Sequence, residues 1–230
     1  MTISLVGLPG GGKSTVGRQL AKRIGARFID SDALLEERIG MPIRSFFEKH
    51  GEAAFRDQEE AVLDELTRHE GEPLIIATGG GAVLRPANRA HLRDRTTVIY
   101  LRSSPEELYR RLRHDTQRPL LQVADPQAKL RELYDLRHPL YEEVAHYSVD
   151  TGRPSVATLV NMIMMQLEMA GLLTLGQTRL PMQAMASGME MELLTRAYNV
   201  CSSSPTLLLR RVCTRLWVAR APILRLTVPT

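Results

Sequence analysis

The stretch Gly7-Leu8-Pro9-Gly10-Gly11-Gly12-Lys13-Ser14-Thr15 matches the pattern G-x-x-x-x-G-K-[ST] at every fixed position. A short apolar run, Ile3–Val6, precedes it, and apolar residues at helical spacing follow it as far as Gly25. Glycines allow a backbone to curl around an anion, and the N-terminal end of the next helix attracts the same negative charge. The stretch therefore predicts a loop that binds the phosphates of a nucleoside triphosphate. A glycine-rich turn with a chance Gly-Lys-Ser is the alternative.

Individual roles follow from the chemistry of such a loop. We expect Lys13 to bring positive charge to the β- and γ-phosphates, and the hydroxyl of Ser14 to face Mg²⁺. Backbone N–H groups and the start of the helix would complete the cradle. The residues expected to bind ATP here are Gly10, Gly11, Gly12, Lys13, Ser14 and Thr15.

Strand and helix patterns alternate over residues 1–173. Apolar runs predict strands at Thr2–Val6, Arg27–Ile29, Pro73–Thr78, Thr97–Leu101 and Tyr147–Asp150. Helical patterns run through residues 34–39, 43–49, 52–69, 86–92, 105–112, 126–144 and 156–167. Alternation of this kind predicts an α/β fold, a three-layer α/β/α sandwich with a five-stranded parallel sheet.

Polar and glycine residues follow the ends of two further strands. Asp30 and Asp32 follow the second strand, and Gly79-Gly80-Gly81 follows the third. Because ligands bind at the carboxyl ends of parallel strands, we expect these groups to converge on the phosphate loop. Asp30 would then hold Mg²⁺ through water, and Asp32 would accept a proton from an attacking hydroxyl. The alternative is that Asp30-Ser31-Asp32 only caps the following helix.

Three arginines lie where they could meet an anionic substrate. Arg56 and Arg137 together could clamp a carboxylate by bidentate pairing, although each alone could be a solvated helix residue. Residues 114–125 lack periodicity and contain Arg118-Pro119, which predicts a loop. Closure of that loop as a lid would bring the charge of Arg118 onto the transferring phosphoryl group.

The charge of the chain is unevenly distributed. The net charge of +4 divides into −1 for residues 1–173 and +5 for residues 174–230, so basicity gives no support for nucleic acid binding by the main domain. We expect residues 174–230 to be a basic, irregular or weakly ordered extension, with a membrane or partner segment as the alternative. The two cysteines, Cys201 and Cys213, both lie in this extension. The first strand begins near Thr2, so we expect no signal peptide. Polar residues interrupt the apolar stretch Val156–Leu173, so we expect no membrane span and a cytoplasmic protein. Since the sequence has no obvious dimer seam, we expect a monomer.

Taken in order, the motifs resemble those of shikimate kinases, which are P-loop kinases. Besides the phosphate loop, the motifs are Asp30-Ser31-Asp32, Phe55-Arg56-Asp57-Gln58-Glu59, Thr78-Gly79-Gly80-Gly81, Arg118-Pro119-Leu120-Leu121 and Arg137-His138-Pro139-Leu140-Tyr141. The resemblance covers about residues 2–170. It implies ATP-dependent phosphorylation of the 3-hydroxyl of shikimate, a step toward chorismate and the aromatic amino acids.

The resemblance also implies roles for single residues. Asp32 would contact the substrate hydroxyls as the candidate base, so the catalytic residues would be Lys13, Asp32 and Arg118. The substrate would be held by Arg56, Arg137 and the backbone of Gly79, Gly80 and Gly81. Arg111 and Arg118 would reach the nucleotide. Arg153 is added on a looser match, because its spacing from Arg137 is one residue short.

The residues are also compatible with two other functions. One is another small-molecule kinase of the same architecture, acting on gluconate or a nucleoside monophosphate. The other is a nucleotide-binding regulator that phosphorylates nothing. Asp32 beside the acceptor site favours a polyhydroxylated acceptor, and intact Lys13 and Arg118 favour catalysis.

Overall fold

The computed structural model describes residues 1–113, 125–152 and 154–173, and these belong to one compact unit. The sequence predictions for Arg118 and its loop, for Arg153 and for residues 174–230 lie outside these described residues. Among the described helices, none is long and apolar enough to cross a membrane.

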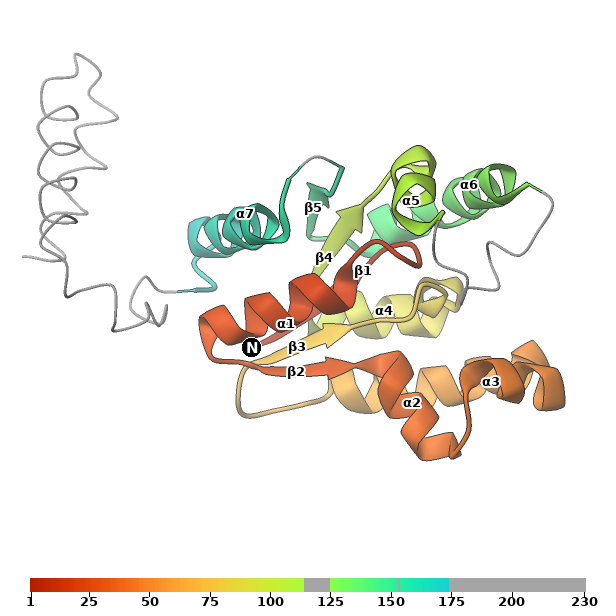
Figure 1. Cartoon of the computed structure of the whole chain (residues 1–230). Coiled ribbons are helices and arrows are strands. Elements are labelled where there is room, and N and C mark those ends of the chain that lie inside the picture. The colour runs from red at the N-terminus through yellow and green to blue at the C-terminus, as the bar shows by residue number, and fades with distance from the viewer. Residues whose placement is uncertain (114–124, 153, 174–230) are drawn as a thin grey trace, which may run out of the picture. The chain divides into compact units, whose positions relative to one another are not determined.

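The described elements alternate as the sequence predicts (Figure 1). The strands are β1 (Thr2–Val6), β2 (Arg27–Asp30), β3 (Leu74–Ala77), β4 (Thr97–Arg102) and β5 (Tyr147–Asp150). The helices are α1 (Lys13–Ile24), α2 (Ser31–Ile39), α3 (Ile43–Thr67), the 3₁₀ turn η1 (Ala82–Leu84), α4 (Pro86–Arg95), α5 (Pro105–Leu112), α6 (Pro126–Val144) and α7 (Val156–Met169). The bounds of α6 and β5 match the sequence prediction residue for residue.

The five strands form one parallel sheet in the order β2-β3-β1-β4-β5. Side chains alternate between its two faces. Leu5 and Ile99 belong to a buried cluster with residues of α1 and α7, while Val6, Val98 and Tyr100 belong to another with residues of α4, α5 and α6. A third cluster packs α2 and α3 against β3. The sheet therefore has helices on both faces, as the predicted three-layer sandwich requires (Figure 1).

This order places β1 between β3 and β4. The chain crosses from β1 to β2, returns to β3 and then passes over β1 to β4. Loops that follow β1 and β3 therefore lie beside each other at the carboxyl edge of the sheet, where ligands bind in such folds.

Helix α3 is interrupted at Gly51, where φ is 80° and ψ is 172°. The sequence predicted two helical stretches that end at Lys49 and begin at Glu52. A glycine adopts this conformation without the steric cost that a Cβ imposes, so the chain turns there and continues into the longer part of α3. That longer part carries Arg56 and Glu59.

Candidate active site

The phosphate loop, Gly7–Gly12, joins β1 to α1. Gly10 and Gly12 have φ of 82° and 87°, in the left-handed region that favours glycine, and Gly12 occupies the N-cap position of α1. The side chain of Lys13 is buried over this loop: its Nζ donates to the carbonyl oxygens of Gly7 at 2.8 Å and Leu8 at 3.0 Å. The predicted strand, loop and helix are confirmed, with an ammonium group at the loop.

The carboxylate of Asp30 accepts hydrogen bonds from the Ser14 hydroxyl and from the backbone N–H groups of Asp32 and Ala33. Its Oδ2 accepts a hydrogen bond of 2.6 Å from the Ser14 hydroxyl, and its Oδ1 accepts one of 3.2 Å from the backbone N–H of Asp32. The second contact caps α2, which is why this helix begins at Ser31 and not at Leu34 as the periodicity predicted. Asp30 therefore does cap α2, but capping is not its only contact, because it also accepts a hydrogen bond from the phosphate-loop serine. Thr15 is exposed on the first turn of α1.

The glycine loop, Gly79–Gly81, follows β3 and lies between two sets of groups. A Cβ on Gly79 would come within 2.4 Å of Asp32 Oδ1 and 3.1 Å of Glu59 Oε1. A Cβ on Gly80 would come within 2.6 Å of the Pro9 ring, in the phosphate loop. The glycine loop therefore touches the phosphate loop on one side and the carboxylates of Asp32 and Glu59 on the other.

Asp32 lies in an environment that disfavours its charge. Burial raises the pKa of its carboxyl from 3.8 to about 6, although the positive charge of Lys13 acts in the opposite direction. The carboxylates of Asp30 and Glu59 add smaller upward contributions to this pKa. The Lys13 ammonium therefore lies close enough to the Asp32 carboxylate for its charge to affect the pKa of that carboxyl. A carboxylate with a pKa near 6 is ionised at neutral pH and is basic enough to take up a proton.

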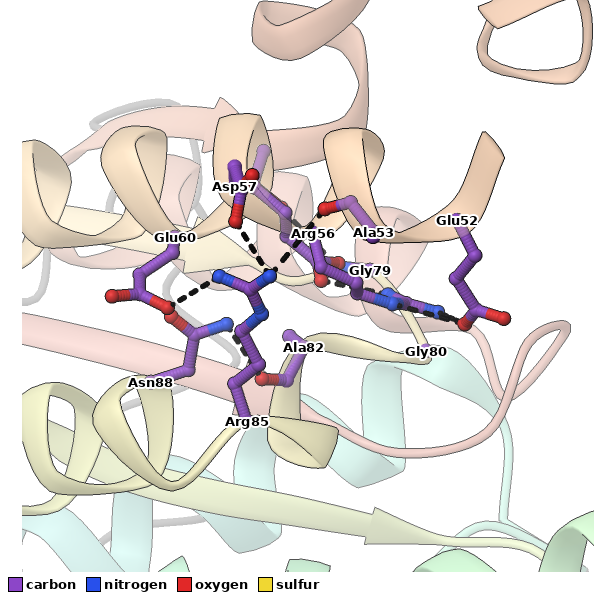
Figure 2. Close-up of polar contacts among 12 residues, drawn as sticks. Glu52, Ala53, Arg56, Asp57, Glu60, Gly79, Gly80, Ala82, Arg85 and Asn88 are labelled. Atoms are coloured by element: carbon purple, nitrogen blue, oxygen red, sulfur yellow. Dashed lines mark hydrogen bonds and ion pairs between the residues drawn. The ribbon is translucent and has the colours of Figure 1, made fainter. Parts of the chain in front are cut away.

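Arg56 is held in the site and is not a solvated helix residue. Its side chain is 12% exposed and pairs with Glu59 at 2.7 Å and with Glu52 at 3.0 Å. A Cβ on Gly81 would come within 2.3 Å of its Nη1, so the guanidinium lies against the glycine loop. Figure 2 shows Arg56 reaching from α3 past Gly79 toward Glu52. The solvated alternative is therefore wrong for Arg56.

Glu59 is the residue whose place the sequence prediction missed. It is 2% exposed, burial raises the pKa of its carboxyl, and the positive charges of Arg56 and Arg137 oppose that shift. It was visible in the sequence as the last residue of the Phe-Arg-x-x-Glu motif, yet no role was expected of it.

On the far side of the glycine loop, α6 supplies two donors. Arg137 Nη1 donates to the Gly80 carbonyl oxygen at 3.0 Å, and the Tyr141 hydroxyl donates to the same oxygen at 2.6 Å. Arg137 Nε is buried and has no hydrogen-bond partner among the described residues. A buried guanidinium N–H without a partner is typical of a group that donates a hydrogen bond to an anionic ligand.

Arg85 ties the segment after the glycine loop to α3. Its guanidinium donates to Asp57 at 2.6 Å, to Glu60 at 2.9 Å and to the Ala53 carbonyl at 3.4 Å (Figure 2). These partners lie on the same stretch of α3 as Arg56. Arg85 thus fixes the helix that carries Arg56 against the segment that follows Gly81.

Arg111 lies on α5, beside the phosphate loop, because the next residue, Leu112, is the side chain that a Cβ on Gly10 would meet. Its guanidinium donates to the side-chain and carbonyl oxygens of Thr151, which directly follows β5. The other two arginines predicted to contact the nucleotide, Arg118 and Arg153, lie outside the described residues.

The sheet order, the phosphate loop with its lysine and the Ser14–Asp30 pair together define the chain as a P-loop α/β protein. Comparison with known proteins narrows this class. A family model described as "Shikimate kinase" matches residues 9–168. Shikimate kinase from Paracidovorax citrulli is 57% identical over 173 residues, covering 75% of this chain and 94% of that protein. Shikimate kinase from Ralstonia nicotianae is 55% identical over 170 residues, or 74% of this chain and 88% of that protein.

A solved structure agrees with these relatives. Shikimate kinase from Acinetobacter baumannii in complex with shikimate is 44% identical, with a TM-score of 0.69, and the match covers 75% of this chain and 95% of that one. The chain therefore belongs to the shikimate kinase family and is an enzyme of that family.

Proposed function

We propose that this enzyme transfers the γ-phosphoryl group of ATP to the 3-hydroxyl of shikimate, giving shikimate 3-phosphate and ADP on the route to chorismate and the aromatic amino acids. The observation that carries the proposal is that the Asp32 carboxylate and the Lys13 ammonium act on one site, where the glycine loop touches the phosphate loop. The carboxylate would accept a proton from the hydroxyl group of the acceptor, and the ammonium would bind the triphosphate of ATP. The family relationship supports the same acceptor.

On the nucleotide side, residues Gly10–Thr15 would hold the phosphates of ATP. The Ser14 hydroxyl and the Asp30 carboxylate, 2.6 Å apart, are hard oxygen donors of the kind that Mg²⁺ prefers, with Asp30 acting through water. The bound Mg²⁺ would supply charge neutralisation on the phosphate oxygens. Lys13 would exchange its bonds to the loop carbonyls for phosphate oxygens. Arg111, Arg118 and Arg153 would complete the nucleotide contacts, with Arg118 stabilising charge on the transferring group.

On the acceptor side, Arg56 and Arg137 would clamp the substrate carboxylate. Support comes from the burial of Arg56 against the glycine loop and from the unpaired Nε of Arg137. Asp32 would orient the attacking hydroxyl and accept its proton. Backbone groups of Gly79, Gly80 and Gly81 would hold the substrate. Support comes from the absence of side chains, which lets the backbone lie directly against Asp32, Pro9 and Arg56.

The test is steady-state ATP turnover against a panel of acceptors: shikimate, gluconate and nucleoside monophosphates. We expect turnover with shikimate alone, and its loss in Asp32→Asn with ATP binding retained. Turnover with gluconate or a nucleoside monophosphate in place of shikimate would assign the enzyme to that acceptor. ATP binding without turnover of any acceptor would indicate a nucleotide-binding regulator.

We further propose that residues 1–173 are the kinase domain, that residues 174–230 are a dispensable extension, and that the enzyme is a cytoplasmic monomer. Limited proteolysis with activity measurements tests the division. We expect cleavage after residue 173 to leave turnover unchanged, and loss of activity in step with cleavage would refute it.

A further inference from the structure

The carbonyl oxygen of Gly80 accepts hydrogen bonds from two side chains on successive turns of α6. Tyr141 lies at 2.6 Å and Arg137 Nη1 at 3.0 Å. Residues four apart on a helix share one face, so both donors reach the same acceptor without distortion. On its other side Gly80 lies against the Pro9 ring of the phosphate loop. The Gly80 peptide is thus the point where α6, the glycine loop and the phosphate loop meet.

Tyr141 is held by burial, by its hydrogen bond to Gly80 and by an aromatic contact. Its side chain is fully buried, and its ring stacks on that of Tyr100 with centroids 5.0 Å apart. Tyr100 in turn lies beside Gly7, where a Cβ would come within 3.7 Å of its ring. Burial raises the pKa of the Tyr141 hydroxyl above its ordinary value, so this group stays protonated and donates at any working pH.

We infer that Tyr141 is a positioning residue for the acceptor substrate: its hydroxyl holds the Gly80 carbonyl and so fixes both the glycine loop and the guanidinium of Arg137. The inference rests on the proposed function, in which these two groups bind shikimate. In this assignment Tyr141 acts through Gly80 and Arg137 and not by contact with the substrate.

The consequence of removing the hydroxyl follows from this shared acceptor. Without Tyr141, Gly80 keeps only the bond from Arg137, and that bond then has to hold both the loop and the guanidinium. The loop gains freedom to move away from Pro9, and Arg137 gains freedom to turn its Nε away from the carboxylate. Both changes weaken acceptor binding and leave the triphosphate site, with Lys13 and Ser14, in place.

The experiment compares Tyr141→Phe with Tyr134→Phe. Tyr134 lies on the same helix, is half-buried and stacks on His138 at 4.6 Å, away from the glycine loop. Loss of one hydrogen bond predicts a KM for shikimate about fivefold higher in Tyr141→Phe, with kcat and the KM for ATP within about twofold of the wild type. Tyr134→Phe should keep all three values. Because both variants retain their rings, they are expected to fold, and both are assayed well below their measured Tm.

A KM for shikimate that stays at the wild-type value in folded Tyr141→Phe would overturn the inference. An equal rise in the KM for ATP would do so too, since it would indicate a general loss of structure. Wild-type turnover of shikimate in the same assay separates the two proposals. If it is normal, only the inference is at stake, and if it is absent, the proposed function fails and the inference fails with it.

Discussion

The phosphate loop and the glycine loop both follow a buried central strand, β1 and β3, and both are rich in glycine, but glycine serves different purposes in them. Gly10 and Gly12 have left-handed backbones, and a Cβ on Gly12 would meet no described heavy atom within 4 Å. Gly79, Gly80 and Gly81 have ordinary backbones, and a Cβ on any of them would collide with a neighbour. The phosphate loop needs glycine for its conformation at Gly12, and for both conformation and space at Gly10, where a Cβ would come within 2.6 Å of the Leu112 side chain. The glycine loop needs glycine for space alone.

This difference shows what a run of glycines can indicate. A loop that curls around an anion uses glycine to point successive N–H groups inward. A loop pressed against side chains and a substrate uses glycine because nothing larger fits. Replacing glycine should therefore have different effects in the two loops, and the following experiments compare those effects on catalysis, ligand binding and stability.

The largest effect is expected from Lys13→Ala, which removes the charge that the phosphate loop presents. Since stabilisation of developing charge is the main work of phosphoryl transfer, we expect kcat to fall by about 10²–10³-fold. The Tm should change little by comparison. Steady-state kinetics and thermal unfolding measure both, and a variant with near-normal kcat would remove Lys13 from the catalytic residues.

A smaller but specific effect is expected from Gly79→Ala. The added Cβ would lie 2.4 Å from Asp32 Oδ1, so it must displace the proposed base or the loop. We expect kcat/KM for shikimate to fall by about tenfold or more, because misplacement by about 1 Å is costly in catalysis. The Kd for ATP, measured by calorimetry, should stay within about twofold. An equal loss in kcat/KM for shikimate and in affinity for ATP would show that a change in the glycine loop also disturbs the phosphate loop.

Gly12→Ala tests the conformational role. A Cβ has room there, but the left-handed backbone costs roughly 1–2 kcal/mol with any L side chain, so we expect a lower free energy of unfolding. Gly40→Ala is the matched control, because Gly40 has φ of 70° and equal space at the end of α2. Both variants should lose similar stability in denaturant titrations, but only Gly12→Ala should bind ATP more weakly. A fully stable Gly12→Ala would contradict the conformational role.

The smallest effect concerns stability and pH. Because the pKa of Asp32 is raised from 3.8 to about 6 on folding, the folded state binds the extra proton between these values, and stability falls as pH rises through that window. Asp32→Asn should therefore be more stable than the wild type at pH 7, by on the order of 1 kcal/mol, and the gain should shrink toward pH 4. Denaturant titrations in EDTA without nucleotide measure it.

Asp94→Asn makes the same substitution at an exposed position on α4, outside the site, and is the control for this last experiment. A gain in Asp32→Asn that is independent of pH would indicate that packing, and not charge, explains the stabilisation.

Most of the fold could be predicted because its signals are local. Helix α6 begins where Asp125 caps it with a proline in the first turn, and α5 begins with the Ser104–Glu107 capping box. Gly51 marks the interruption of α3. The start of α2 was misplaced because its first turn is held by the side chain of Asp30, which apolar periodicity does not report.

The site residues that follow the ends of strands could be predicted from the sequence. Those that depend on how the helices pack could not. Parallel strands bring the phosphate loop, Asp32 and the glycine loop to one edge, so their convergence follows from chain order. Glu59 and Tyr141 reach the same place only because α3 and α6 pack at particular positions and rotations. Local spacing in the sequence does not contain that information. For the same reason, the sequence left a solvated position open for Arg56 and for Arg137 when each was considered separately.

The carboxylate of Asp30 divides its two oxygen atoms between different tasks, one bonded to Ser14 and the other to the first turn of α2. A group arranged in this way can exchange one partner without giving up the other. In the proposed function, nucleotide and Mg²⁺ bind on the Ser14 side, and we expect the helix that begins with Ser31 and Asp32 to remain anchored when they do. We therefore expect the proposed acceptor site to keep its shape while the nucleotide site fills and empties.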